Sequence, residues 1–118
     1  MGERGRPRCN QGGALVARGD VCWLELPDEG RRPVCVLTRA AALPVLHNVT
    51  VALVTRTVRG IPTEVRLDER DGMPAECAIT LDNLRTVPKR MLTERITGLS
   101  GGQMHAVCRA LDVATGCS

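Results

Sequence analysis

The sequence predicts a mainly β domain, a small barrel or strongly bent sheet of six or seven short strands, with one C-terminal helix. Segments of alternating or β-branched residues recur along the chain, and stretches rich in Gly, Pro and Asp separate them. A helical hydrophobic period begins only after residue 100. Many short strands with turn chemistry between them are typical of small barrels. The length of 118 residues fits one domain with one core.

Three segments predict the first three strands. "DVCWLELP", residues 20–27, alternates between two faces, and "PVCVLT", residues 33–38, is an apolar run suited to a buried strand. Between them, "PDEGRRP" has the composition of a turn. "NVTVALVTRT", residues 48–57, is β-branched and alternating, which makes it the strongest strand signal in the chain. The segment before it, "ALPVL", is expected to be an irregular connection or a short turn.

The second half of the chain predicts further short strands. "TEVRL", residues 63–67, alternates after the turn "RGIP". The polar loop "DERDGMP" precedes a strand over "ECAITLD", residues 76–82. "NLRTV", residues 83–87, is expected to be a separate short strand after a bend, limited by Pro88. "LTERITGL", residues 92–99, is expected to return as one more strand.

The end of the chain predicts one amphipathic helix, packed over an end or an open side of the sheet. Ser100 with Gln103 has the form of a capping box, and Gly116 suits a helix stop. The apolar stripe at helical spacing consists of Met104, Val107, Cys108, Leu111 and Ala114.

Residues 1–17 contain Gly, Arg and Ala without any period and are expected to form a disordered arm, so that the folded domain spans residues 18–118. No apolar run approaches the ~18 residues of a membrane span. The first residues include basic side chains but no sustained apolar region of the kind found in a signal peptide. We therefore expect a cytoplasmic protein with no membrane partner.

Six cysteines raise the question of a disulfide framework or a metal site. None of them forms a CxxC pair, and several lie in apolar stretches such as "DVCWLEL" and "PVCVLT". Buried thiols behave as small hydrophobes, and a cytosolic protein keeps them reduced. His47 and His105 are far from each other and from any cysteine pair at zinc spacing. We expect free thiols, no metal and no cofactor.

The stretch "VTRTVRG", residues 54–60, gathers hydroxyl and guanidinium groups at the end of a predicted strand. It belongs to a longer segment, between Glu29 and Glu64, that contains five arginines and no acidic residue. One-sign segments of this kind concentrate positive potential on one face, and guanidinium groups bind phosphate or carboxylate oxygens. A GC-rich genome explains the choice of Arg over Lys, but it does not explain the missing Asp and Glu.

Five segments in order identify a family resemblance: "RGDVCWLELP", "RRPVCVLTR", "NVTVALVTRTVRGIPTEV", "LDNLRTVPKRMLTERITGLS" and a final short helix. From Arg18 to about Cys117 the chain resembles the MazF/PemK-type toxins, the mRNA interferases of type II toxin–antitoxin systems. The resemblance implies an SH3-like barrel with a C-terminal helix, also seen in the CcdB toxins, and a homodimer. The family pattern starts near Val16, which makes residues 1–15 an extension of it.

The resemblance also implies an activity: sequence-specific, metal-independent cleavage of single-stranded RNA to 2′,3′-cyclic phosphate and 5′-hydroxyl ends. The target is mRNA, or alternatively rRNA or tRNA. An antitoxin of the MazE type would neutralise the toxin. We expect that antitoxin to be acidic and partly disordered, to fold across the basic groove, and to compete with RNA.

Residue by residue, the resemblance assigns the catalytic arginine to Arg32, in "GRRPV", and the catalytic threonine to Thr55, in "LVTRT". A Gln and a basic residue of the family correspond to Asn83 and Arg85. Some members carry a glutamate in the loop before the arginine, but Glu29 is offset from that position and receives no such role. The predicted RNA-binding residues are Arg31, Arg56, Thr57, Arg59, Asn83 and Arg85.

Structural interpretations of the same residues stay open at this point. Arg32 could pair with Asp20 or Glu25, and Arg56 and Arg59 fit a solvated rim as well as RNA contacts. Trp23, the only aromatic residue, fits a core or a dimer interface better than a stacking platform, so base recognition must rely largely on hydrogen bonds. A non-enzymatic toxin on the same fold, inhibiting a protein target such as DNA gyrase, is the alternative function, because fold alone does not decide activity.

Overall fold

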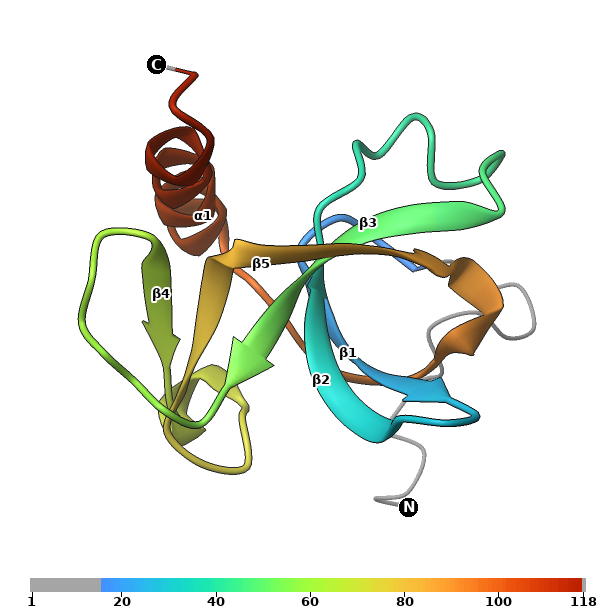
Figure 1. Cartoon of the computed structure of the whole chain (residues 1–118), viewed down its shortest axis with the longest axis horizontal. Coiled ribbons are helices and arrows are strands. Elements are labelled where there is room, and N and C mark those ends of the chain that lie inside the picture. Colours follow the sequence, from blue (N-terminus) through green and yellow to red (C-terminus); the bar gives the residue numbers. More distant parts are fainter. Residues whose placement is uncertain (1–15, 118) are drawn as a thin grey trace.

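The computed structural model describes residues 16–117, which fold into one curved sheet of six antiparallel strands and one α-helix (Figure 1). The order of strands in the sheet is β4-β5-β3-β2-β1-β6. β4 and β6 are its two edges, so the sheet curls without closing through hydrogen bonds. The elements are β1 (Asp20–Leu26), β2 (Gly30–Val36), β3 (Asn48–Thr55), β4 (Glu64–Leu67), η2 (Glu69–Asp71), β5 (Cys77–Pro88), η3 (Lys89–Met91), β6 (Leu92–Gly98) and α1 (Gly101–Thr115).

The prediction of a mainly β barrel-like fold with a C-terminal helix is confirmed, with two differences in its details. The segments expected as two strands, 76–82 and 83–87, form the single 12-residue strand β5. The pairing register of β5 with β3 shifts between Ala52 and Leu53, which leaves extra β5 residues opposite that point. This irregularity is a β-bulge, and bulges bend a strand without ending it. The expected bend is therefore present inside one continuous strand.

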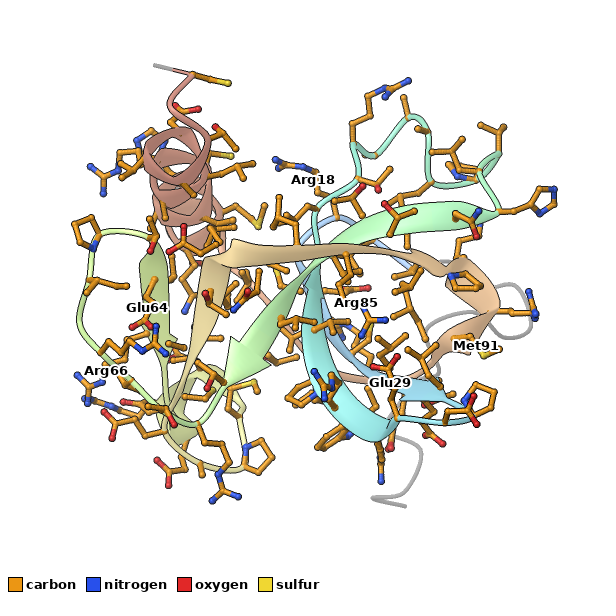
Figure 2. All side chains as sticks on the ribbon, in the orientation of Figure 1. Arg18, Glu29, Glu64, Arg66, Arg85 and Met91 are labelled. Atoms are coloured by element: carbon orange, nitrogen blue, oxygen red, sulfur yellow. The ribbon has the colours of Figure 1, made fainter. Side chains whose placement is uncertain are left out.

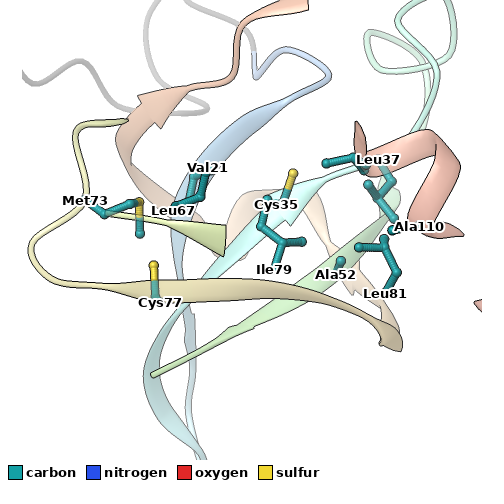
Figure 3. Packing of buried hydrophobic residues seen from close by; sticks show 11 residues of the cluster. Val21, Cys35, Leu37, Ala52, Leu67, Met73, Cys77, Ile79, Leu81 and Ala110 are labelled. Atoms are coloured by element: carbon teal, nitrogen blue, oxygen red, sulfur yellow. The ribbon is translucent and has the colours of Figure 1, made fainter. Parts of the chain in front are cut away.

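The second difference is that the sheet serves two cores rather than one. Side chains on one face of β1, β2 and β3 fill the inside of the curl. We call this group, whose members include Leu24, Val34 and Val51, the barrel core. Side chains on the opposite face, among them Cys35 and Ala52, pack with Ile79 and with Val107 and Ala110 of α1 (Figure 3). We call this second group the helix core. Alternation along each strand supplies both cores because successive side chains point to opposite faces.

The C-terminal helix has the ends that its sequence predicts. The Ser100 hydroxyl oxygen accepts a hydrogen bond from the backbone N–H of Gln103 at 3.1 Å, and the Gln103 side chain accepts one from the backbone N–H of Ser100 at 2.8 Å. Gly116 ends the helix in the left-handed conformation, with φ of 69°. Within the predicted stripe Val107 is fully buried, and Met104, Cys108, Leu111 and Ala114 are partly buried. The stripe thus covers the helix core.

The folded part of the chain begins slightly earlier than the sequence predicts. Val16, which belongs to the predicted arm, is only 3% exposed and is part of the barrel core, and the Ala17 N–H donates to the Asp20 carboxylate at 2.9 Å. The rest of the arm predicted for residues 1–17, namely residues 1–15, lies outside the described residues. No helix within residues 16–117 is both long and apolar enough to cross a membrane.

Four of the cysteines, Cys35, Cys77, Cys108 and Cys117, are free thiols. Cys22 is fully buried and disulfide-bonded, so the expectation of reduced thiols is wrong at that position. Burial raises the pKa of Cys35 to about 12 and that of Cys77 to about 11, because desolvation disfavours the thiolate.

Candidate functional site

Strand alternation divides the predicted site residues between the two faces of the sheet. On β2, Arg32 has the parity of the barrel-core residues Val34 and Val36. On β3, Thr55 shares the parity of Val51, and Val51 pairs with Arg85 of β5. Cross-strand partners lie on the same face. Arg32, Thr55 and Arg85 therefore belong to the concave face, where the barrel core reaches solvent.

Arg32 and Thr55 lie beyond the last residues that pair between β2 and β3, although Arg32 pairs with Leu24 of β1 and Thr55 with Ala78 of β5. The ladder between β2 and β3 ends at the pair Val34 and Leu53. Continuing that register by two residues would place Arg32 opposite Thr55, but the two strands diverge there (Figure 1). Arg32 and Thr55 thus lie at the diverging ends of these two strands, and each is paired only on its other side, with β1 and β5 respectively. Neither residue is buried, so both are accessible to a ligand.

Arg85 is held by Glu29 across the mouth of the barrel. The Arg85 Nη1 and Nη2 atoms donate to the two carboxylate oxygens of Glu29, at 2.7 and 3.1 Å. Figure 2 shows the two side chains directed toward each other in the space between β5 and the β1–β2 turn. The hydrogen bond from Arg85 and, more weakly, the charge of Arg32 lower the pKa of the Glu29 carboxyl, while the pKa of Arg85 is raised. We call Glu29, Arg32, Thr55 and Arg85 the barrel-mouth group.

The Thr55 hydroxyl has a defined role in its turn. Its oxygen accepts a hydrogen bond from the backbone N–H of Thr57 at 3.1 Å, which closes a local turn at the end of β3. A hydroxyl that accepts in this way still has its own O–H to donate. The Thr55 O–H therefore remains available to donate to a ligand while the turn holds its oxygen.

The opposite face carries a separate cavity of about 360 Å³ beside the same strand ends. Arg31 lies over the ring of Trp23, with its guanidinium carbon 4.2 Å from the ring centroid. The Arg31 guanidinium also bonds Glu94 at 3.1 Å and lies 3.6 Å from Glu25. Arg31 is thus already engaged by two carboxylates and an aromatic ring. The cavity is lined by Trp23, Arg31, Pro33, Val54, Arg56, Met73, Pro74, Ala75 and Cys77.

The remaining predicted contacts are on loops and on the bulge. Arg56, Thr57 and Arg59 are exposed on the β3–β4 connection, where the backbone N–H of Arg59 donates to the Glu64 carboxylate at 2.9 Å. Asn83 is exposed within the irregular part of β5. Strand parity assigns none of these four residues to a face, because a loop and the irregular part of β5 carry them; Arg56 lines the cavity on the opposite face.

The structural alternative for Arg32 does not hold, because its suggested partners pair elsewhere. Asp20 bonds Arg95 at 3.0 Å, and Glu25 lies beside Arg31. The main residue that sequence reasoning missed is Glu29. A signal was present in the sequence, since Glu29 is the last acidic residue before the acid-free segment, but its partner Arg85 is 56 residues away.

No histidine is positioned at the mouth of the barrel. His47 precedes β3 at the end opposite Thr55, and His105 is exposed on α1. Within residues 16–117, no three side chains of His, Cys, Asp or Glu converge in a way that would hold a metal ion. The chemistry that the barrel-mouth group offers is therefore anion binding by two guanidinium groups and a hydroxyl, next to one carboxylate.

Comparison with known proteins decides the family. The model for the PemK-like, MazF-like toxin of type II toxin–antitoxin systems matches residues 17–115. The chain belongs to the PemK/MazF toxin family. This PemK/MazF toxin is 44% identical over 106 residues to "Probable endoribonuclease MazF5" of Mycobacterium tuberculosis, an alignment that covers 89% of this chain and 97% of the relative.

Solved structures agree with this assignment. The toxin superposes on "Mycobacterium tuberculosis toxin MazF-mt6" with a TM-score of 0.77 and 35% identity, covering 84% of this chain and 98% of that one. An "Endoribonuclease in complex with its cognate antitoxin from Mycobacterial species" gives a TM-score of 0.79 at 25% identity, with coverage of 88% and 98%. The SH3-like toxin fold predicted from the sequence is therefore confirmed.

Proposed function

We propose that this toxin is a sequence-specific, metal-independent endoribonuclease that cleaves single-stranded RNA to 2′,3′-cyclic phosphate and 5′-hydroxyl ends. The observation that carries the proposal is the placement of Arg32 and Thr55 on one concave face, at the diverging ends of β2 and β3, with Arg85 on the same face. Family membership and the endoribonuclease names of its relatives support the same activity.

The proposed reaction is an internal transfer at phosphorus. The RNA 2′-hydroxyl gives up its proton to solvent, and its oxygen forms a bond to phosphorus while the bond to the 5′-oxygen breaks. The departing 5′-oxygen takes up a proton, so the products are a cyclic phosphodiester and a 5′-hydroxyl. The negative charge on the phosphoryl oxygens must be stabilised throughout, and preorganised donors supply the largest part of such stabilisation.

Arg32 and Thr55 would act as the clamp for this phosphate. A guanidinium binds two phosphate oxygens at once, and the Thr55 O–H adds a third donor from the other side of the opening. An arginine stays protonated at neutral pH and is a poor base, so the catalytic gain would come mainly from positioning and charge. Because well-placed acid–base groups add ~10²–10⁴-fold, we expect slower turnover than in histidine-based ribonucleases.

Arg85 would bind a second phosphate. Its cross-strand partner Val51 precedes Thr55 by four residues on β3, which corresponds to about 13 Å along the strand. An extended single strand lying along the concave face could therefore contact the Arg32–Thr55 clamp and Arg85 with different phosphates. Arg56, Thr57, Arg59 and Asn83 would contact bases or the backbone beyond this stretch, and Arg31 would contribute from the opposite side of β2.

The proposed partners follow from the family. A structural neighbour is a complex of an endoribonuclease with its cognate antitoxin, and we propose that this toxin likewise binds a MazE-like antitoxin, whose acidic segment competes with RNA for the concave face. We also propose that it acts as a homodimer in the cytoplasm, where its RNA substrates are.

The test is to incubate the purified protein with long, weakly structured RNAs in EDTA and to map the new ends. Discrete cuts with cyclic phosphate termini are expected in the wild type. Arg32→Ala should abolish them, and Arg39→Ala removes the same charge from an exposed turn of the same acid-free segment and should leave them intact. Thr55→Ser should retain cleavage better than Thr55→Val, because serine keeps the hydroxyl.

Two results would contradict the proposal. Full cleavage by folded Arg32→Ala would show that the clamp is elsewhere. A folded wild-type dimer that cuts none of several RNAs, but whose toxicity depends on a type II topoisomerase, would favour the protein-target toxin. Simultaneous binding of antitoxin and RNA would contradict the proposed competition.

A further inference from the structure

The contact between Glu29 and Arg85 has the geometry of a bound anion. Two guanidinium nitrogens of Arg85 donate to the two oxygens of one carboxylate, at 2.7 and 3.1 Å. Arginine binds phosphate through the same parallel pair of N–H donors. The fork that a substrate phosphate would use is therefore occupied by a group of the protein itself.

The surrounding charges favour an anion at this point. The hydrogen bond from Arg85, and after it the positive charges of Arg85 and Arg32, lower the pKa of the Glu29 carboxyl, so it stays ionised at neutral pH. Glu29 is the one residue in the barrel-mouth group that carries negative charge, against two guanidinium groups. With Glu29 in place, the net charge of the group is +1, and with Glu29 displaced the two guanidinium groups face the ligand together.

Glu29 can move more easily than Arg85. Its side chain is 42% exposed and lies in the β1–β2 turn, where its N–H donates to the Leu26 carbonyl at a long 3.3 Å. The next residue, Gly30, has φ of +77°, and a Cβ added to it would have no heavy atom within 4 Å, so the turn has room. Arg85, in contrast, belongs to the paired part of β5 opposite Val51. The carboxylate is on a loop, and the guanidinium is on a strand.

We propose that Glu29 is an internal substitute for a substrate phosphate: it fills the Arg85 site in the free protein, and a backbone phosphate of RNA must displace it. The inference rests on the proposed function only in naming RNA as the ligand. Glu29 is then a residue that sets affinity by competition. It favours strands that contact several sites of the concave face at once, because a single phosphate must compete with a carboxylate attached to the same molecule.

The experiment measures binding without cleavage. The probe is a fluorescein-labelled single-stranded oligodeoxynucleotide of random sequence, which lacks the 2′-hydroxyl needed for internal attack, and binding is followed by anisotropy in the whole protein. The key variant is Glu29→Gln, which keeps the shape of the side chain and removes its charge. The matched control is Asp28→Asn, which removes the same charge from the neighbouring exposed position of the same turn, while Arg85 bonds Glu29.

If Glu29 competes directly, Glu29→Gln binds the probe a few-fold more tightly than Asp28→Asn does. This gain in affinity disappears in an Arg85→Gln background, because the guanidinium that Glu29 would release is no longer present. The salt dependence also changes: the slope of log K against log salt becomes steeper by about 0.7 in Glu29→Gln. In the wild type, binding of a phosphate to Arg85 frees the Glu29 carboxylate, which then takes up a cation from solution. This uptake offsets the cation that the bound phosphate releases, so the salt dependence of the wild type is weaker.

Other outcomes overturn the inference. Equal gains in probe affinity for Glu29→Gln and Asp28→Asn would mean that only the overall charge of the protein matters. A gain for Glu29→Gln that persists in the Arg85→Gln background would mean that Glu29 does not act through Arg85. Weaker binding by folded Glu29→Gln would mean that Glu29 orders the site instead of blocking it. The RNA cleavage assay separates this inference from the proposed function: a clear gain in binding without any cleavage contradicts only the proposed reaction, and cleavage without a gain contradicts only the competition.

Discussion

Gly72 is expected to be the glycine whose replacement costs the most stability among those at left-handed positions with described surroundings. It ends the short helix η2 with φ of +93° and ψ of 6°, and its N–H donates to the Glu69 carbonyl at 3.1 Å. A Cβ at this position would lie 2.7 Å from the Thr97 hydroxyl oxygen and 3.0 Å from the Thr97 Cβ. That hydroxyl donates to the Asp71 carbonyl at 2.8 Å, so it ties η2 to the edge strand β6.

Two contributions determine the expected cost of Gly72→Ala. A non-glycine residue in the left-handed region costs about 1–2 kcal/mol. Moving Thr97 away from the new Cβ would weaken its hydrogen bond to Asp71, at about 1 kcal/mol. The sum is about 2–3 kcal/mol, which for a domain of this size corresponds to a fall in Tm of about 8–12 °C.

The matched control is Gly60→Ala. Gly60 also has positive φ, +70°, but nothing lies within 4 Å of its Cβ position, so this variant should lose only the backbone contribution. Urea and thermal unfolding, followed by circular dichroism, measure the difference. In a Thr97→Ala background the extra cost of Gly72→Ala should shrink, because the hydroxyl at 2.7 Å is gone. Equal losses in Gly72→Ala and Gly60→Ala would refute the steric argument.

Four further predictions concern the core, the helix and the thiols. Leu24→Ala, at a fully buried position of the barrel core, should destabilise the fold by about 2–5 kcal/mol in urea unfolding, and a loss below about 1 kcal/mol would mean that the core collapses around the cavity. Ser100→Ala removes the hydroxyl that accepts a hydrogen bond from the Gln103 N–H, and it should lower the free energy of unfolding by about 1 kcal/mol in urea unfolding; no loss would mean that water replaces the hydroxyl. Iodoacetamide at pH 8 should modify exposed Cys117 well before buried Cys77, because the pKa of Cys77 is raised to about 11, and mass spectrometry of early peptides checks the order. Since an unfolded thiol titrates near 9.0 and that of folded Cys77 near 11, the folded chain binds more protons between these values, and stability should fall as pH rises through this window; a flat profile there would contradict the raised pKa.

The strands and the helix could be predicted from the sequence because each depends on a local pattern. Alternation sets the faces of a strand, and the Ser100 cap and Gly116 stop fix the ends of α1 without reference to the rest of the chain. The continuity of β5 could not be predicted, since the residues around Asp82 have the composition of a break. Only the pairing with β3 shows that the strand passes through this point as a bulge.

Arg32, Thr55 and Arg85 were named from the family resemblance and their roles stay predictions, whereas Glu29 and the arrangement of the group could not be predicted. Alternation along β2 is enough to place Arg31 and Arg32 on opposite faces, although the prediction named Arg32 as catalytic and Arg31 as RNA-binding without separating their faces. The pairing of Arg85 with Glu29 depends instead on how the curl brings the β1–β2 turn over β5. No local pattern encodes a contact across 56 residues.

The two cores have a consequence for how this protein can change. In the central parts of β1, β2 and β3, inward and outward side chains are both buried, so neither face is open to substitution there, and a shift of one residue would exchange the contents of the two cores. Variation is tolerated mainly in the connections and beyond the residues that pair between β2 and β3. Those are the same places that carry Glu29, Arg32, Thr55 and the β3–β4 loop. The strand ends and connections that carry the candidate site can thus change at a lower cost in stability than the two cores.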